Sequence, residues 1–173
     1  MKARYHAGLD RSDGCAHIGN MDKIELNEEE WRQRLSPVQY HVLREAGTER
    51  AFSGSLNLEK RDGEFLCGGC GGLLFRSADK YDSGSGWPSF TEPASPDAIT
   101  ERRDVSHGMV RIEVCCARCD GHLGHVFHGE RLTAANERHC VNSLSIRYVD
   151  TPLPAPAAEE VLRDKLRGGP LDA

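Results

Sequence analysis

Cys67-Gly-Gly-Cys70 and Cys116-Ala-Arg-Cys119 are the stretches of this sequence that most constrain its fold. Each pair has the spacing of a knuckle, in which a strand turns so that two thiolates face one ion, and glycines permit the tight turn. Four thiolates favour tetrahedral zinc, because soft sulfur ligands select zinc or iron among the available metals. With all four positions filled by protein, such a zinc ion is structural rather than catalytic.

The 45 residues between the two pairs exceed the length of a common zinc ribbon. We therefore expect the knuckles to come from two separate hairpins that one ion joins. The alternatives are a redox dithiol at one pair, or structural cysteines without a ligand. Cys115 lies beside a ligand and is interpreted as a strand residue.

The composition describes a chain of 173 residues with a net charge of −5, which is long enough for a single domain and is not rich in core residues. The acidic balance argues against a nucleic-acid partner. No apolar run approaches the roughly 20 residues that span a bilayer, so no membrane contact is expected. Seven cysteines without a secretory signal indicate metal and thiol chemistry in a reducing compartment, and the cytoplasm is the expected location.

The chain divides into three parts by pattern. Residues 1–22 lack periodicity and are predicted to be a flexible N-terminal extension, either a mobile leader or vector-derived. Residues 23–150 form the expected domain. Residues 151–173 begin with alternating prolines and are predicted to be a peripheral tail with a short helix at 159–167.

Within the domain, one or two short helices are expected between Asn27 and Leu43, with Asn27 as an N-cap and Pro37 opening the second helix after Ser36. After Gly47 the pattern changes to short apolar runs separated by glycine and proline. Strands are predicted at residues 64–66, 72–75, 109–114 and 143–149. The last two alternate apolar and polar residues, which is typical of half-buried antiparallel strands.

A further cysteine, Cys140, lies in the polar stretch Arg138-His-Cys-Val-Asn142. A thiol is nucleophilic only as its thiolate, and a nearby cation lowers the thiol pKa. If the segment is a strand, alternation puts Arg138, Cys140 and Asn142 on one face, with Arg138 stabilising the thiolate and Asn142 donating to a substrate oxygen. The alternative is an inert cysteine buried in a sheet.

Two imidazoles, His122 and His125, follow the second knuckle and are candidates for proton transfer near neutral pH. Histidines three residues apart are also common as structural or metal-binding groups. Trp87, among turn-forming residues, offers either a rigid exposed indole or a buried core side chain.

Four motifs in this order resemble the methionine-R-sulfoxide reductases, the B-type enzymes. They are Lys80-Tyr-Asp-Ser-Gly-x-Gly-Trp-Pro-Ser-Phe90, Asp104-x-Ser-His-Gly-Met109, Arg118-Cys-Asp-Gly-His-Leu-Gly-His-Val-Phe127 and Arg138-x-Cys-Val-Asn-Ser143. The resemblance runs from about residue 27 to residue 148. It implies a mainly β fold of the β-tent type, with two antiparallel sheets clipped by a structural zinc and short N-terminal helices. It also implies that one zinc ion is held by Cys67, Cys70, Cys116 and Cys119.

The activity implied by the resemblance is thiol-dependent reduction of methionine R-sulfoxide, protein-bound or free, in the repair of oxidised proteins. By analogy, Cys140 attacks the sulfoxide sulfur and becomes a sulfenic acid. His125, helped by His122, protonates the departing oxygen, which leaves poorly otherwise. Asn142 and Arg138 organise the polar side of the pocket. The expected partners are the oxidised substrate and thioredoxin or another thiol reductant, and the protein is expected to be a monomer.

The resemblance also implies a substrate-binding set of Trp87, His107 and Phe127. Trp87 would pack against the S-methyl group of the substrate. Because the methyl group and the oxygen must occupy different walls of the pocket, only the R epimer presents its sulfur to the nucleophile.

One departure from the family pattern concerns recycling of the nucleophile. Many members have a resolving cysteine in the Gly-x-Gly-Trp-Pro stretch, where this chain has Ser85. The candidates for resolving the sulfenic acid are an external thiol or thioredoxin, Cys15 on the N-terminal extension, and Cys115.

Two smaller departures lie near the candidate site. His139 stands where tyrosine is more usual, and residues 128–131 are His-Gly-Glu-Arg where Pro-Asp-Gly-Pro is common. An acidic residue that often supports the active-site histidine is therefore missing or replaced by Glu130, which leaves the tuning of His125 open.

Three other functions fit parts of the pattern. A non-enzymatic zinc-binding chaperone on the same scaffold would not need Cys140, His125 and Trp87 together. A nucleic-acid-binding zinc ribbon would need a basic face, against which the net charge argues. A thiol peroxidase using Cys140 would consume hydrogen peroxide faster than methionine sulfoxide.

Overall fold

The structure, a computed structural model, describes residues 23–150 of the chain. The predicted extension at 1–22, with Cys15, and the predicted tail at 151–173 lie outside these described residues.

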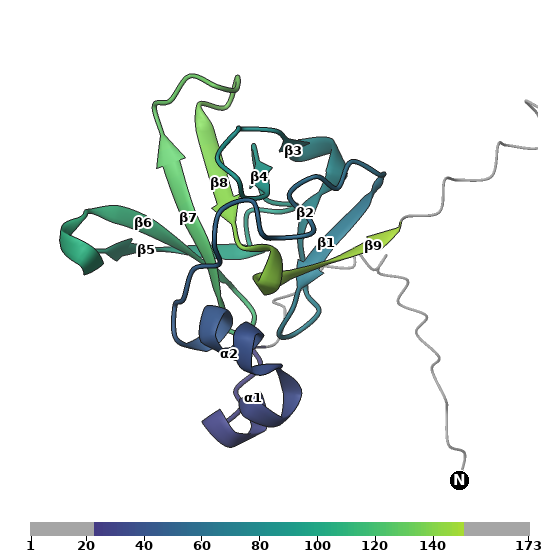
Figure 1. Cartoon of the computed structure of the whole chain (residues 1–173), viewed down its shortest axis with the longest axis vertical. Helices are drawn as coiled ribbons and strands as arrows, with labels where there is room; N and C mark the ends of the chain where they lie inside the picture. The colour runs from purple at the N-terminus through teal and green to yellow at the C-terminus, as the bar shows by residue number, and fades with distance from the viewer. Residues whose placement is uncertain (1–22, 151–173) are drawn as a thin grey trace, which may run out of the picture.

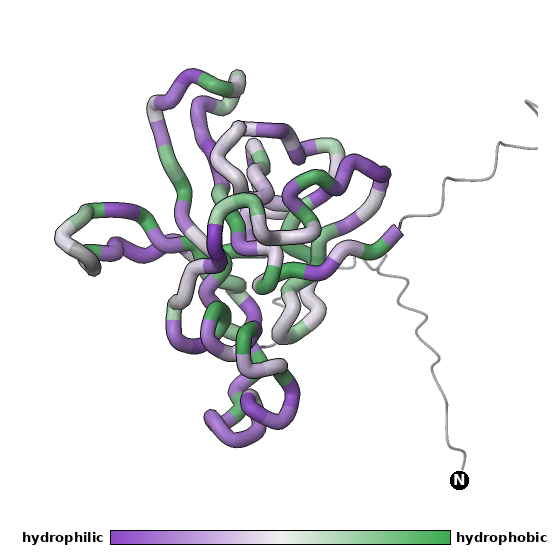
Figure 2. Tube along the Cα trace, viewed as in Figure 1, coloured by the Kyte–Doolittle hydropathy of each residue, from purple (hydrophilic) through white to green (hydrophobic). Residues whose placement is uncertain are grey.

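Two short helices open the described part of the chain, α1 (Glu28–Arg34) and α2 (Pro37–Arg44). Each begins with a capping box, built on Asn27 and on Ser36, in which side chain and backbone exchange hydrogen bonds across three residues. Both helices and their predicted caps are therefore confirmed. In α1 only Trp31 is buried, and the rest of this helix is hydrophilic (Figure 2).

Nine strands in two antiparallel sheets follow within the described residues. The smaller sheet has the order β2-β1-β9, and the larger has the order β3-β4-β8-β7-β6-β5. Their bounds are β1 Gly63–Cys67, β2 Leu73–Arg76, β3 Lys80–Tyr81, β4 Ser89–Phe90, β5 Ile99–Asp104, β6 Arg111–Cys116, β7 His122–His128, β8 Glu137–Val141 and β9 Ile146–Asp150. Three short 3₁₀ helices lie between them: η1 Ser77–Asp79, η2 Ser106–Gly108 and η3 Ser143–Ser145. The prediction of a mainly β chain with two antiparallel sheets is confirmed.

The two long hairpins of the larger sheet diverge from one another (Figure 1). The β5–β6 hairpin and the β7–β8 hairpin project from the centre of the molecule in different directions, while the two helices lie at the opposite end from the β7–β8 turn. Helix α2 contacts β7 and η3, so the helices close the base of the sheet where β7 begins. No helix among residues 23–150 is long and apolar enough to cross a membrane.

Aromatic side chains join the two sheets. Phe90 of β4 stacks on Phe75 of β2 with ring centroids 4.3 Å apart, and its ring meets the edge of Phe65 of β1 at 5.0 Å. All three rings are fully buried, and each contributes about 2–3 kcal/mol from the removal of apolar surface from water. This core positions the edge of the larger sheet, β3 and β4, against the strand that carries Cys140.

The predicted strand at 143–149 is wrong in its first half. Residues Ser143–Ser145 form η3, and β9 begins only at Ile146. The backbone N–H groups of Ser143 and Leu144 donate to the carboxylate of Glu49 at 2.6 and 3.0 Å, and the Ser145 hydroxyl donates to the Asn142 carbonyl at 2.7 Å. These local and tertiary bonds replace the ladder that the alternating pattern suggested. The predicted strands at 64–66, 72–75 and 109–114 overlap β1, β2 and β6 and are confirmed.

Candidate active site and metal centre

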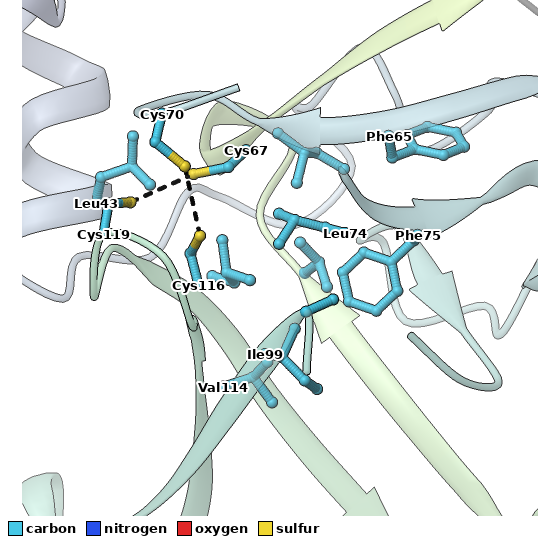
Figure 3. Packing of buried hydrophobic residues seen from close by; sticks show 14 of the residues in the cluster. Leu43, Phe65, Cys67, Cys70, Leu74, Phe75, Ile99, Val114, Cys116 and Cys119 are labelled. Atoms are coloured by element: carbon cyan, nitrogen blue, oxygen red, sulfur yellow. Dashed lines mark hydrogen bonds between the residues drawn. The ribbon is translucent and has the colours of Figure 1, made fainter. Parts of the chain in front are cut away.

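The four paired cysteines meet where the two sheets approach one another (Figure 3). Cys67 ends β1 and Cys116 ends β6, while Cys70 and Cys119 lie in the turns that follow. The Sγ atoms of Cys67 and Cys119 are 3.6 Å apart, as are those of Cys70 and Cys116, and all four lie within 4.8 Å of one another. The two knuckles therefore come from two separate hairpins, as the spacing predicted.

This sulfur cluster fits a single tetrahedral ion. Zinc–sulfur bonds of about 2.3 Å place the sulfurs of a tetrahedral site roughly 3.8 Å apart, close to the separations observed. A disulfide would need about 2.05 Å. All four side chains are buried in the core, so an ion here would be closed to solvent and would join the smaller sheet to the larger one. The four cysteines can hold a metal ion.

Cys140 lies in a different environment, on one wall of a cavity of about 110 Å³. It is half-buried, whereas the other five cysteines of the described residues are buried. The cavity is lined by Thr48, Trp87, Arg111, Gly124, His125, Phe127, Cys140, Val141 and Asn142. Four of the residues that the sequence singled out, Trp87, His125, Phe127 and Asn142, thus meet around the candidate nucleophile.

Strand register explains how Cys140 meets its neighbours. In β8 it is directly opposite His125 of β7 on one side and Ser89 of β4 on the other. Residues directly opposite in antiparallel strands point to the same face, with Cβ atoms about 4.5–5.5 Å apart. The imidazole of His125 and the thiol of Cys140 therefore share the cavity, although fifteen positions separate them in the sequence.

Burial raises the pKa of the Cys140 thiol above its ordinary value, and the positive charge of Arg138 and a hydrogen bond from Ser85 oppose this effect. The sequence led us to expect a thiol pKa lowered by Arg138. The cation has that influence, but removal of the thiol from water outweighs it. Cys140 is consequently a neutral thiol in the resting protein near pH 7.

His125 is held by Asp104, a residue of β5 that the sequence analysis did not single out beyond its motif. The Nε2 atom of His125 lies 2.8 Å from Asp104 Oδ2, and the same oxygen accepts from Arg111 Nη2 at 2.7 Å. Burial lowers the pKa of His125, while the bond to Asp104 raises it. Hydrogen bonds from Ser106, His125 and Arg111 hold the pKa of Asp104 well below its usual range, so this carboxylate is charged.

Glu130 does not take the supporting role that the sequence suggested for it. Its carboxylate accepts from Nε and Nη2 of Arg138 at 2.7 and 2.9 Å. The guanidinium of Arg138 also lies 4.4 Å from the ring centroid of Phe127, directly across the β7–β8 ladder. Glu130 therefore fixes the cation beside Cys140, and Asp104 supports His125.

His122 lies beside His125 but behind it, outside the residues that line the cavity. Its Nδ1 atom is 2.7 Å from Glu113 Oε1, its Nε2 atom is buried without a partner, and its ring centroid is 5.5 Å from that of His125. Residues three apart in a regular strand face opposite sides. Here the register slips between Val114 and Cys115, and this bulge brings both imidazoles together.

Trp87 and Asn142 are positioned through Glu49, a buried residue that no local pattern marks. The indole of Trp87 donates to the Glu49 carbonyl at 3.0 Å, and the Glu49 N–H donates to Asn142 Oδ1 at 3.0 Å. The Asn142 amide also donates to the Leu123 carbonyl at 3.0 Å. Trp87 is half-buried at the cavity wall; the core tryptophan of the described residues is Trp31.

Comparison with known proteins yields one family for this arrangement. A SelR domain model matches residues 35–150. A peptide methionine sulfoxide reductase MsrB of Bradyrhizobium diazoefficiens is 54% identical over 127 residues, which cover 73% of this chain and 90% of that protein. The chain belongs to the MsrB family of peptide methionine sulfoxide reductases. MsrB proteins of a Synechococcus strain and of Leptospira interrogans are 52% and 45% identical, over 75% and 73% of this chain and 94% and 95% of their own lengths.

In this MsrB chain the position of the usual resolving cysteine is occupied by a hydroxyl. The Oγ atom of Ser85 lies 4.0 Å from Cys140 Sγ. Cys115 does not substitute for the missing thiol as folded, because β7 lies between its strand and β8. Two strand spacings of about 4.8 Å exceed the Cα separation of about 7 Å that a disulfide tolerates. Burial also raises the pKa of the Cys115 thiol to about 12.

Two further candidates from the sequence are not placed in the site. Cys15 is outside the described residues. His107 lies in η2, at the tip of the β5–β6 hairpin, and its side chain is outside the described part of the structure.

Proposed function

We propose that this MsrB chain reduces the R epimer of methionine sulfoxide to methionine, with Cys140 as the nucleophile. The observation that carries the proposal is the register that sets Cys140 against His125 within the cavity lined by Trp87 and Asn142. In the reaction the Cys140 sulfur attacks the substrate sulfur, and the oxygen atom ends on Cys140. The substrate sulfur gains two electrons, Cys140 loses two, and the products are methionine and a sulfenic acid.

Proton movement in this scheme needs no external acid. The resting thiol is neutral because burial raises its pKa, and burial lowers the pKa of His125. The thiol proton passes to the imidazole as the thiolate forms, and from there to the sulfoxide oxygen, which must be protonated to leave. Asp104 holds Nε2 of His125, so Nδ1 is the ring nitrogen that transfers the proton. His122, paired with Glu113, acts through His125.

The remaining groups of the site bind and orient the substrate. Trp87 and Phe127 form apolar walls for the S-methyl group, and His107 contributes at the hairpin tip. Arg138 stabilises the thiolate from its position two residues along β8. One amide hydrogen of Asn142 is used by Leu123, which leaves the second for a substrate oxygen.

We propose further that the metal is one structural zinc ion on Cys67, Cys70, Cys116 and Cys119, and that residues 23–150 form the catalytic domain. Oxidised proteins and free methionine R-sulfoxide are the proposed substrates, with thioredoxin or another thiol as the reductant. The protein is proposed to act as a monomer in the cytoplasm, without nucleic acid or membrane.

A single turnover tests the function. Fully reduced protein is mixed with methionine R-sulfoxide or S-sulfoxide without added reductant, and methionine and Cys140 are followed by chromatography and peptide mapping. We expect one equivalent of methionine from the R epimer, none from the S epimer, and one added oxygen on Cys140. An unchanged Cys140 would contradict the proposal and favour a zinc-binding scaffold protein, and faster consumption of hydrogen peroxide would favour a peroxidase.

A further inference from the structure

Three serine hydroxyls form a continuous chain that ends at the candidate nucleophile. Ser89 Oγ lies 2.7 Å from Ser83 Oγ, which lies 2.9 Å from Ser85 Oγ, which in turn lies 4.0 Å from Cys140 Sγ. Ser89 is fully buried in β4, opposite Cys140, and its hydroxyl donates to the Trp87 carbonyl at 3.3 Å. The chain therefore links the Trp87 backbone carbonyl to the thiol through three side chains.

The protons of this chain can be counted, because each hydroxyl donates one hydrogen bond. With a neutral thiol, four protons are available for the four hydrogen bonds of the chain. Each group then donates to the next one: Cys140 to Ser85, Ser85 to Ser83, Ser83 to Ser89, and Ser89 to the Trp87 carbonyl. Once the thiol ionises, three protons remain for four links. In the arrangement that gives the thiolate a donor, Ser89 donates to Ser83, Ser83 to Ser85, and Ser85 to the sulfur. The hydrogen bond from Ser89 to the Trp87 carbonyl, the longest of the three oxygen–oxygen contacts, is then lost.

We propose that Ser89, Ser83 and Ser85 form a hydroxyl relay that reverses its direction when Cys140 ionises, so that Ser85 donates to the thiolate and later to the sulfenic oxygen. Ser85 is then a catalytic residue, and Ser83 and Ser89 are positioning residues that act through it. Hydrogen bonds in such a chain polarise one another, which strengthens the last one, at the charged end. The second half of this proposal rests on the reductase function proposed above.

Two features are consistent with the relay. The hydrogen bond from Ser85 lowers the pKa of Cys140 against the larger effect of burial. Among the described residues, no second thiol lies within disulfide reach of Cys140, since Ser85 is the residue 4.0 Å from its sulfur and Cys115 is separated from it by β7. A persistent sulfenic acid needs a hydrogen-bond donor, and Ser85 supplies one at the spot where a second thiol would otherwise form a disulfide.

The relay also serves regeneration by an external thiol. The first external thiol attacks the Cys140 sulfur, forms a mixed disulfide and displaces the oxygen, which leaves as water. A second external thiol cleaves that disulfide, is oxidised with the first to an external disulfide, and returns Cys140 as a thiol. A donated proton from Ser85 assists departure of the oxygen, so loss of the hydroxyl slows this step as well as the first.

The test is the pKa of Cys140, measured from the pH dependence of its alkylation by iodoacetamide in the full chain and read by peptide mapping. For Ser85→Ala we expect alkylation at pH 7 to slow about tenfold, because losing a hydrogen bond to a thiolate raises its pKa by about one unit. For Ser83→Ala, which removes a group that does not touch Cys140, we expect a slowing of about threefold in the same direction. Ser85→Thr keeps the hydroxyl and should restore the rate to within about twofold.

Ser53→Ala is the matched control, because this exposed hydroxyl bonds only to the Arg50 carbonyl at 2.6 Å. It should leave the alkylation profile unchanged. An unchanged pKa in Ser85→Ala, or a Ser83→Ala profile identical to that of the unsubstituted protein, would overturn the relay. Alkylation uses no sulfoxide, so a protein that fails to reduce methionine R-sulfoxide but shows these shifts would refute the reductase function and keep the thiolate half of the relay.

Discussion

Two sulfur sites in this molecule show how surroundings divide one chemistry into two roles. At the four-cysteine cluster, each thiol has sulfur neighbours, is buried, and comes from the end of a strand or from the turn that follows it. At Cys140, the thiol is half-buried inside a strand and has an imidazole and a hydroxyl as neighbours. The first arrangement satisfies all four positions around an ion and leaves nothing reactive. The second leaves one sulfur with proton-transfer groups and space for a substrate.

The largest expected effect comes from Cys140→Ser, which removes the reactive sulfur and leaves the four-cysteine cluster unchanged. Activity on methionine R-sulfoxide should fall at least about a thousandfold, because the hydroxyl is a far weaker nucleophile than the thiolate. Metal content and thermal stability should stay close to those of the unsubstituted protein. Steady-state assays, metal analysis and a thermal melt on the same sample measure all three.

The control for this substitution is Cys115→Ser, a thiol-to-hydroxyl change at a cysteine outside both sites. It should keep its activity and its metal, and it also tests the resolving role once considered for Cys115. Measurable turnover by Cys140→Ser would show that the nucleophile is another group, and the contrast between the two sulfur sites would fail.

Cys116→Ser addresses the other side of the comparison. Removing one of four thiolates should weaken metal binding and lower the free energy of unfolding by several kcal/mol, about 3 or more, because an ion held by this cluster would join the two sheets. Activity should fall only as far as the protein unfolds. Chelator titration and denaturant unfolding measure the change, and a variant that keeps its stability after the loss of metal would show that the cluster does not hold the fold together.

The sequence predicted the metal centre better than it predicted the active site. The reason is that local spacing sets the metal ligands, whereas the active-site contacts join residues far apart in the sequence. Cys67-x-x-Cys70 and the caps at Asn27 and Ser36 are local patterns, in which a few neighbouring residues determine the geometry. The fold class likewise followed from alternating runs, together with family resemblance. The exception was the segment at 143–149, where Glu49 takes backbone donors from 94 and 95 residues away.

The supporting groups of the active site depend instead on strand order. Asp104 contacts His125 because β5 and β7 both flank β6, and no spacing in the sequence predicts that contact. Glu130 was the plausible acid from motif comparison, yet it pairs with Arg138 across the β7–β8 turn. The sequence also could not predict that the pKa of Cys140 is raised, because this shift depends on how deeply the fold buries the thiol.

Asp104→Asn should change the pH dependence of the reaction more distinctly than its rate. Asp104 raises the pKa of His125 against burial, so loss of its charge lets that pKa fall further. The acid limb of the kcat/KM profile should therefore move to lower pH, with a drop of about tenfold at its plateau. Asp97→Asn, at an exposed position, is the control. An acid limb that moves to higher pH would exclude Asp104 as the group that tunes His125.

The smallest effect is expected at Glu49→Gln, which tests the scaffold of the Cys140 site. The Glu49 carboxylate accepts the backbone N–H groups of Ser143 and Leu144, and an amide offers only one oxygen to these two donors. The free energy of unfolding should fall by about 1–3 kcal/mol. Because Trp87 and Asn142 are held through the Glu49 backbone, KM should rise while metal content stays constant.

Glu45→Gln, a carboxylate at an exposed position in the same segment, should change stability by no more than about 0.5 kcal/mol. Denaturant unfolding, steady-state kinetics and metal analysis together decide the case. A loss of metal in Glu49→Gln would mean that the two sulfur sites are coupled through η3, whose residue Ser145 accepts a hydrogen bond from Gly68, between Cys67 and Cys70. Constant metal content with a raised KM would show that the closed site and the reactive site are built on separate supports, although both are anchored in the same two sheets.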